Sequence, residues 1–228
     1  MKTKKLLAVL LATLIMLTMF AACGDKSDHD SEKDDKTAET STSGNINSDS
    51  EVTDPDMPDY LKDEHEEENN TTGIHPGRIS GNTYTNTSVG ITFTKPDDWK
   101  FKFTNAPSDK ADFYESLSQG GVTEMEAESP NGSLSVGFQD LSAVNSENTT
   151  EEDFLTEIKE IWSHAETSEI YKKTISNHTY SAVDITVKSN EDIVNQRIYV
   201  RKEGKYIIAI TMTSTSDNDF DSLEKLFS

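Results

Sequence analysis

The acidic stretch from Gly24 to His75 is the feature that most limits how this 228-residue chain can fold. It holds 17 Asp and Glu residues against four Lys residues, a net charge of −13 in 52 residues, and scarcely any aliphatic side chain. Such a stretch buries too little apolar surface to offset the conformational entropy that is lost on ordering. We therefore predict a disordered linker of about 40 Å end to end, which self-repulsion extends further.

The carboxylates of this stretch have an alternative interpretation. Runs such as Asp54 to Asp59 and Glu64 to Glu68 could collect divalent cations, since clustered carboxylates suit Ca²⁺ and Mg²⁺. No run has a fixed coordination geometry, so a solvated spacer is the favoured interpretation. We predict no metal site and no cofactor.

A leader precedes the linker and ends at a single cysteine. Residues 1–22 are first basic and then apolar, the small residues Ala21 and Ala22 close the leader, and Cys23 is the only cysteine in the chain. This order is typical of a bacterial lipoprotein signal. It predicts cleavage before Cys23, lipidation of that residue, and a membrane anchor on the extracytoplasmic face of the cell membrane. The predicted divisions are residues 1–22 (signal peptide), 23–78 (lipidated cysteine and linker) and 79–228 (globular domain).

The alternative for the leader is a retained transmembrane helix. Leu6 to Ala22 spans 17 residues, which is the lower edge of the length of about 17 to 25 residues that crosses a bilayer. An acidic stretch follows the leader, and no Lys or Arg stop precedes it. A lipidated cysteine would consume the only thiol, so the folded part is expected to be held together by packing without a disulfide.

Alternation and turn signals begin near Ile79 and continue to Ser228, enough for one domain. The strongest helix pattern runs from Glu151 to Ala165, where Thr149 and Glu152 are expected to form a capping box. The other expected helices are Ser108–Gln119, with Phe113, Tyr114 and Leu117 inward, and Phe220–Phe227. The expected strands are Thr83–Asn86, Val89–Thr94, Trp99–Phe103, Val122–Glu128, Leu134–Phe138, Ile170–Ile175, Tyr180–Val187, Ile193–Arg201 and Tyr206–Thr213.

Strands punctuated by three helices, without regular βαβ alternation, predict an α+β fold in which helices flank an antiparallel sheet. The string from Asn82 to Trp99, with Tyr84, Asn86, Gly90 and a Pro-Asp-Asp-Trp ending, resembles the opening of PsbP-like domains. The resemblance extends in element order over residues 79–228, and such domains occur in uncharacterised lipoproteins of Gram-positive bacteria. It implies an α/β/α sandwich, a role in binding or assembling macromolecules, and no shared catalytic residues.

The charge of the domain excludes some partners. From Pro76 onward there are 25 acidic and 14 basic residues, which disfavours nucleic acid and anionic membrane surfaces. The basic groupings are expected to be solvated strand faces, although they could meet an acidic partner. These groupings are Lys100 and Lys102 on one strand, and Arg197, Arg201, Lys202 and Lys205 around the last hairpin.

Catalytic motifs are not found. The chain has no Walker loop and no dinucleotide fingerprint, and the stretch Gly132 to Gly137 has the wrong spacing for a nucleophile elbow. We therefore predict a surface-anchored binding or assembly module whose partner is an envelope protein or a cell-wall component. The alternative is an extracytoplasmic hydrolase with dispersed His, Asp and Glu residues, for which His164 and His178 are the candidates.

Overall fold

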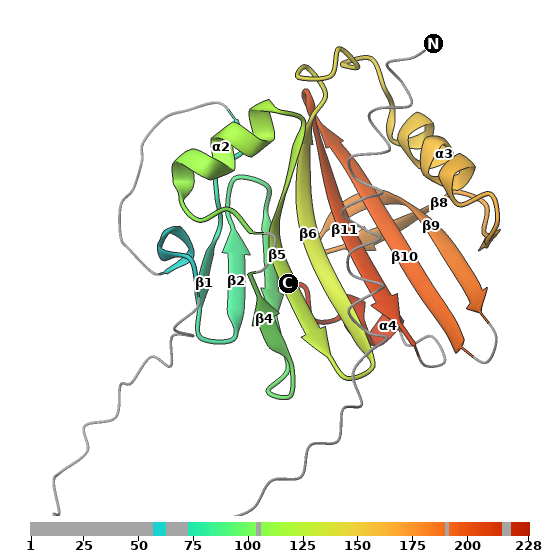
Figure 1. Cartoon of the computed structure of the whole chain (residues 1–228), viewed down its shortest axis with the longest axis horizontal. Helices are drawn as coiled ribbons and strands as arrows, with labels where there is room; N and C mark the ends of the chain where they lie inside the picture. The colour runs from blue at the N-terminus through green and yellow to red at the C-terminus, as the bar shows by residue number, and fades with distance from the viewer. Residues whose placement is uncertain (1–56, 63–72, 104–105, 190–191, 216–219) are drawn as a thin grey trace, which may run out of the picture.

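The computed structural model describes residues 57–62, 73–103, 106–189, 192–215 and 220–228. The predicted leader, Cys23 and most of the predicted linker lie outside the described residues. Two antiparallel sheets make up most of the described part (Figure 1). Their elements in chain order are η1 (Asp59–Leu61), β1 (Arg78–Ser80), β2 (Thr83–Asn86), β3 (Ile91–Thr94), β4 (Lys100–Lys102), α2 (Lys110–Ser118), β5 (Gly121–Ser129), β6 (Gly132–Asp140), α3 (Glu151–Ile161), β7 (Glu166–Thr167), β8 (Tyr171–Ile175), β9 (His178–Ser189), β10 (Asp192–Glu203), β11 (Tyr206–Ser214) and α4 (Phe220–Glu224).

The large sheet has the strand order β4-β5-β6-β11-β10-β9-β7, and β8 pairs with the first part of β9. Short connections between successive strands favour this antiparallel order. A two-residue turn joins β10 to β11, and Gly204 takes the positive φ of 58° that this turn requires. The small sheet has the order β1-β2-β3, and backbone bonds between Thr94 and Leu226 and between Thr92 and Ser228 extend it at β3.

Each face of the large sheet carries its own hydrophobic core. Along β11, Ile208, Ile210 and Met212 belong to the first core, while Ile207 and Ala209 belong to the second. Successive side chains of a strand point to opposite faces, so β11 lies between the two cores. The first core is shared with the small sheet, α2 and α4, and the second with α3.

The predicted α/β/α sandwich of a helix-flanked sheet is wrong. The described residues contain three α-helices of nine, eleven and five residues, whereas the strands form one eight-stranded and one three-stranded sheet. Helices of five and nine residues are only about 8 and 14 Å long, which is too short to cover a face of an eight-stranded sheet. The small sheet, with Ile79, Tyr84, Ile91 and Phe93, fills space over the first core that the prediction gave to helices.

Many local predictions are confirmed. In the opening string, Tyr84, Ile91, Phe93 and Trp99 are all buried, as expected for apolar residues on the inner face of a strand pair. Every predicted strand has a counterpart, with bounds that shift by a few residues. Tyr114 is an exception to the predicted inward face of α2, because its side chain is 40% exposed.

The folded part begins earlier in the chain than residue 79. Met57, Leu61 and Ile74 all belong to the first core, although the sequence places them in the acidic linker. Met57, Tyr60 and Leu61 form a small apolar group inside a strongly acidic stretch, so composition averaged over the whole stretch gives no sign of burial.

The capping box of α3 lies one residue later than predicted. The Thr150 side chain accepts a hydrogen bond from the Asp153 backbone N–H at 3.1 Å, and the Asp153 carboxylate accepts one from the Thr150 N–H at 3.1 Å. Both the Thr149/Glu152 and the Thr150/Asp153 pairs have the right spacing. The helix itself starts at Glu151, which selects the second pair.

This geometry predicts different effects for two adjacent threonines. Thr150→Ala should lower the free energy of unfolding by about 1 kcal/mol, because the helix loses its N-cap acceptor. Thr149→Ala is the matched control, and chemical denaturation measures both. Equal losses in the two variants would contradict the assignment of the cap.

Candidate functional site

Glu124 is an unusual residue of the large sheet because it is an acidic side chain with no exposed surface. The pairing of β5 with β6 shifts register between Thr123 and Met125, which marks Glu124 as the extra residue of a β-bulge. Bulges re-aim side chains and are frequent next to functional sites. Here the irregularity places a carboxylate in the interior, between the large sheet and the small one.

Three neutral donors surround the Glu124 carboxylate. The Gly77 backbone N–H donates to Oε1 at 2.5 Å, Asn86 Nδ2 donates to Oε2 at 3.1 Å, and the Tyr84 hydroxyl donates to the same Oε2. Tyr84 and Asn86 lie on β2, and Gly77 lies just before β1. These hydrogen bonds therefore tie the small sheet and its N-terminal arm to the large sheet.

Burial raises the pKa of Glu124 to about 7, because the charged form loses its hydration. The hydrogen bonds from Tyr84, Gly77 and Asn86 act in the opposite direction, since they stabilise the carboxylate, but they do not outweigh burial. The pKa of Tyr84 is raised well above its usual value by its own burial and by the charge of Glu124. Glu124 therefore exchanges its proton near neutral pH.

Further polar groups line the same region. The Tyr60 hydroxyl of η1 is buried and has no hydrogen-bond partner among the described residues, and both burial and the charge of Glu124 raise its pKa. The His75 carbonyl accepts a hydrogen bond from Asn86 at 2.8 Å. The His75 ring Nδ1 lies 2.9 Å from the Tyr114 hydroxyl on α2.

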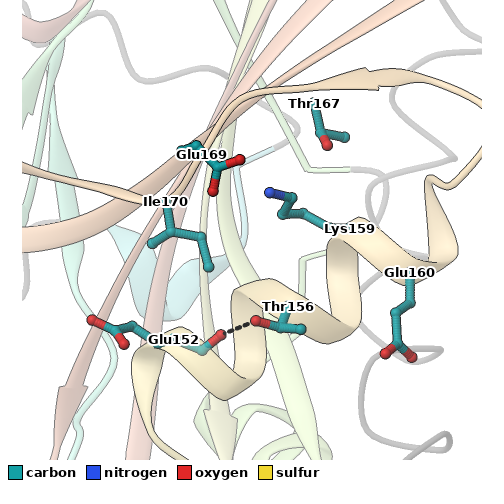
Figure 2. A pocket seen from close by; sticks show the side chains of 7 residues that line it. All are labelled: Glu152, Thr156, Lys159, Glu160, Thr167, Glu169 and Ile170. Atoms are coloured by element: carbon teal, nitrogen blue, oxygen red, sulfur yellow. Dashed lines mark hydrogen bonds between the residues drawn. The ribbon is translucent and has the colours of Figure 1, made fainter.

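A surface hollow of about 510 Å³ lies elsewhere, between α3 and the segment from β7 to β8. Figure 2 shows its lining, with Lys159 and Thr156 on the helix and Glu169 and Ile170 across from them. Lys159 Nζ donates to the Ser168 carbonyl at 2.8 Å, so this amine is already engaged. The full lining is Glu152, Thr156, Lys159, Glu160, Thr167, Glu169 and Ile170. The hollow is polar and open, and its volume is within the range of ligand sites.

Two arginines that the sequence suggested were solvated form hydrogen bonds within the fold instead; Arg197 is half-buried and Arg201 is buried. Arg197 donates to both oxygens of Asp184, at 2.6 and 3.0 Å, and to Glu224 of α4 at 3.0 Å. Arg201 is 9% exposed, and its guanidinium donates to the Val89 carbonyl in the turn between β2 and β3. The interpretation of these two residues as a solvated face is wrong, because pairing partners come from elements distant in sequence.

The two histidines considered as catalytic candidates have separate surroundings. The His164 ring lies against the Trp162 ring, with 5.4 Å between the centroids. His178 hydrogen-bonds the Gly90 backbone, and its pKa is lowered by burial and then by the charge of Arg201. The two rings therefore have different neighbours, Trp162 for His164 and the Gly90 backbone for His178.

Two features are absent from the described ranges. Among residues 57–62, 73–103, 106–189, 192–215 and 220–228, no group of three or more His, Cys, Asp or Glu side chains is placed to hold a metal ion. Within the same ranges no helix has the length and apolar character to cross a membrane.

Glu124 was not among the site residues predicted from the sequence. Simple alternation from Val122 to Glu128 places Glu124 on the polar face together with Glu126 and Glu128. The sequence does hint at the bulge. In a regular strand Val122 would point to one face, whereas the apolar residues Met125 and Ala127 would point to the other. A bulge between them reconciles the two sets, as the structure shows.

Comparisons with known proteins do not assign this chain to a family. No protein-family model and no curated protein matches it. Among solved structures, it is similar to LpqN, described as involved in cell envelope biogenesis of Mycobacterium tuberculosis, with 12% sequence identity and a TM-score of 0.34. The match covers 60% of this chain and 76% of that one. No family model and no curated protein confirms the resemblance to PsbP-like domains, which is specific only in the string from Asn82 to Trp99.

The buried carboxyl predicts a pH-dependent stability difference. The folded state retains the Glu124 proton up to about pH 7, whereas an unfolded chain loses it near the ordinary value of 4.5. The contribution of Glu124 to the free energy of unfolding is therefore lost as the pH rises from about 4.5 to 7, and it stays absent at higher pH. Glu124→Gln, which resembles the protonated carboxyl, should raise the free energy of unfolding at pH 8 by on the order of 1–3 kcal/mol and change it little at pH 5.

Denaturant titrations at the two pH values measure this difference. Glu160→Gln, at an exposed glutamate of the hollow, is the control and should shift stability equally little at both. If Glu124→Gln were destabilising by the same amount at pH 5 and pH 8, the carboxyl would not be the origin of the pH dependence.

Proposed function

We propose that this chain is a lipid-anchored protein of the extracytoplasmic membrane face that acts as a binding or assembly module. The observation that carries the proposal is the leader of residues 1–22, which is basic and then apolar and is followed directly by Cys23. A diacylglyceryl thioether at Cys23 supplies two acyl chains. Two chains anchor stably, whereas one chain binds only marginally and reversibly.

The acidic segment after Cys23 acts in this proposal as a spacer between membrane and domain. Its net negative charge is repelled by anionic lipid headgroups, which keeps the domain off the surface. The folded part takes in Met57 and Leu61, so the spacer ends before Met57 and is shorter than composition alone suggests.

The hollow beside α3 supports the binding role. Its volume of about 510 Å³ falls within the roughly 300–1,000 Å³ of ligand sites. Its lining supplies carboxylates and hydroxyls from two separate segments, around an amine that is already bonded to Ser168. The proposed partner is an envelope protein or a cell-wall component that presents hydrogen-bond donors to this surface.

Substitution of the anchor residue tests the location. Cys23→Ser should move the protein from the membrane fraction to the soluble fraction and abolish labelling by a fatty-acid analogue, because no thiol remains for acylation. Fractionation of cells that express the parent or the variant measures both effects. Equal membrane retention of the two proteins would contradict the lipid anchor.

Site-specific photo-crosslinking on intact cells tests the binding role. A crosslinking amino acid in place of Thr156, in the hollow, should capture one recurrent envelope component. The same amino acid in place of Asn131, in the exposed turn between β5 and β6, is the matched control and should not capture it. Capture at neither position, or equally at both, would count against the hollow as the binding surface.

A further inference from the structure

The large sheet ends at a strand edge beside the hollow. Strand β7 is last in the strand order of this sheet, and β8 pairs with β9 off the end of that order. The hollow lies between α3 and the segment from β7 to β8 (Figure 2). The outer side of an edge strand carries backbone N–H and C=O groups with which an extended peptide can pair. The hollow is therefore a corner between a helix and a sheet edge.

Thr167 is the residue at which this edge is open. Glu166 and Thr167 pair with β9, and the Ser168 N–H donates to the Asp184 carbonyl of β9 at 2.9 Å. Successive residues of an antiparallel strand direct their backbone groups alternately toward the partner strand and away from it. Since the Ser168 N–H is directed toward β9, the N–H and C=O of Thr167 are directed outward. Thr167 also lines the hollow, so these outward groups lie beside it.

The two strands of this edge differ in their protection. Strand β8 carries Lys172 and Lys173, and Lys172 forms an ion pair with Glu151 of α3 at 2.9 Å. Lysines on an edge strand oppose pairing with another chain. Strand β7 consists of Glu166 and Thr167 and carries no lysine. Pairing with another chain is therefore expected at β7, next to the hollow.

The lining of the hollow is acidic. Glu152 and Glu160 of α3 and Glu169 of the opposite segment supply three carboxylates, and Lys159 supplies one ammonium, so the net charge is −2. Among the described residues, no ion pair joins these three carboxylates to a Lys or Arg side chain. The Lys159 amine donates to the Ser168 carbonyl at 2.8 Å. The free charges of the hollow are thus negative and complement a positively charged side chain.

We propose that this corner binds an extended, basic peptide segment of another envelope protein, which adds to the large sheet as a strand beside β7. The inference rests on the binding role proposed above and names the class of partner and the mode of recognition. The outward backbone groups of Thr167 pair with the added segment. The carboxylates of Glu152 and Glu169 pair with its Lys or Arg side chains, and Ile170 offers an apolar contact.

Strand geometry sets the pattern of the partner segment. Thr167 pairs with Ile185, which belongs to the second core, as α3 does. Side chains on that face of the added strand therefore point toward the flank of α3, and they recur at every second residue. The partner segment is accordingly expected to carry basic residues at alternate positions.

Panning of a random linear peptide library against the full-length protein in detergent tests the class of partner. The enriched sequences should carry Lys or Arg at alternate positions, because only every second side chain reaches the carboxylates. The same library panned against Glu169→Gln should give weaker enrichment of these sequences. Absence of enrichment, or enrichment of acidic or helical sequences, would overturn the proposal.

The enriched peptide then tests strand addition. Its binding should protect the Thr167 amide from hydrogen exchange, because that N–H gains a partner. N-methylation of alternate backbone nitrogens of the peptide, in the register that faces β7, should weaken binding about tenfold or more, since the charges stay and the backbone bonds are lost. An N-methylated peptide that binds as tightly as its parent in both registers would overturn strand addition.

Charge variants test the role of the carboxylates. Glu169→Gln should weaken binding of the enriched peptide by about two- to fivefold, as expected for an exposed ion pair, and the loss should shrink at high salt. Asp98→Asn is the matched control, because Asp98 is an exposed acid in the turn between β3 and β4. Equal losses in the two variants would mean that overall charge attracts the peptide, and the assigned site would be wrong.

Two outcomes separate this inference from the proposed function. Capture of an envelope component at Thr156 without any enriched peptide would overturn strand addition and leave the binding role in place. Absence of both the capture and the enrichment would contradict both proposals.

Discussion

Packing on both faces of the large sheet is the constraint on which the rest of the structure depends. The described part contains no cysteine, so its stability rests on apolar burial and hydrogen bonds. Strand β11 supplies Ile208 and Ile210 to one core and Ile207 and Ala209 to the other. A strand that is buried on both sides needs a cover for each face. The α3 helix packs over one core, and the small sheet with α2 and α4 packs over the other.

The small sheet is too short to fold by itself, since its strands have three or four residues each. The small sheet is held in place by its apolar contacts and by hydrogen bonds to two buried polar side chains of the large sheet. Glu124 accepts hydrogen bonds from β2 and the preceding arm, and Arg201 donates to the Val89 carbonyl in the turn before β3. The first of these side chains, Glu124, ionises near neutral pH, so the attachment of the small sheet is pH-sensitive at that point.

This arrangement connects the domain with its position on the cell. The proposed anchor, Cys23, belongs to the N-terminal region of the chain, and this region meets the folded body at Met57 and Leu61, which are buried in the first core. The hollow beside α3 lies at the second core.

The sequence by itself determined the local elements, because hydrophobic period and turn residues are local properties. The strands and the amphipathic helix that starts at Glu151 could be predicted in this way. Only the tertiary structure decided how the sheet faces are covered, since that depends on contacts between distant segments. The same holds for Glu124: its burial follows from a bulge in β5, and its partners come from residues about 40 positions away. Alternation along the strand predicts that the Glu124 carboxyl is exposed to solvent. In the structure it is an interior group with a pKa of about 7, because desolvation depends on the assembled fold.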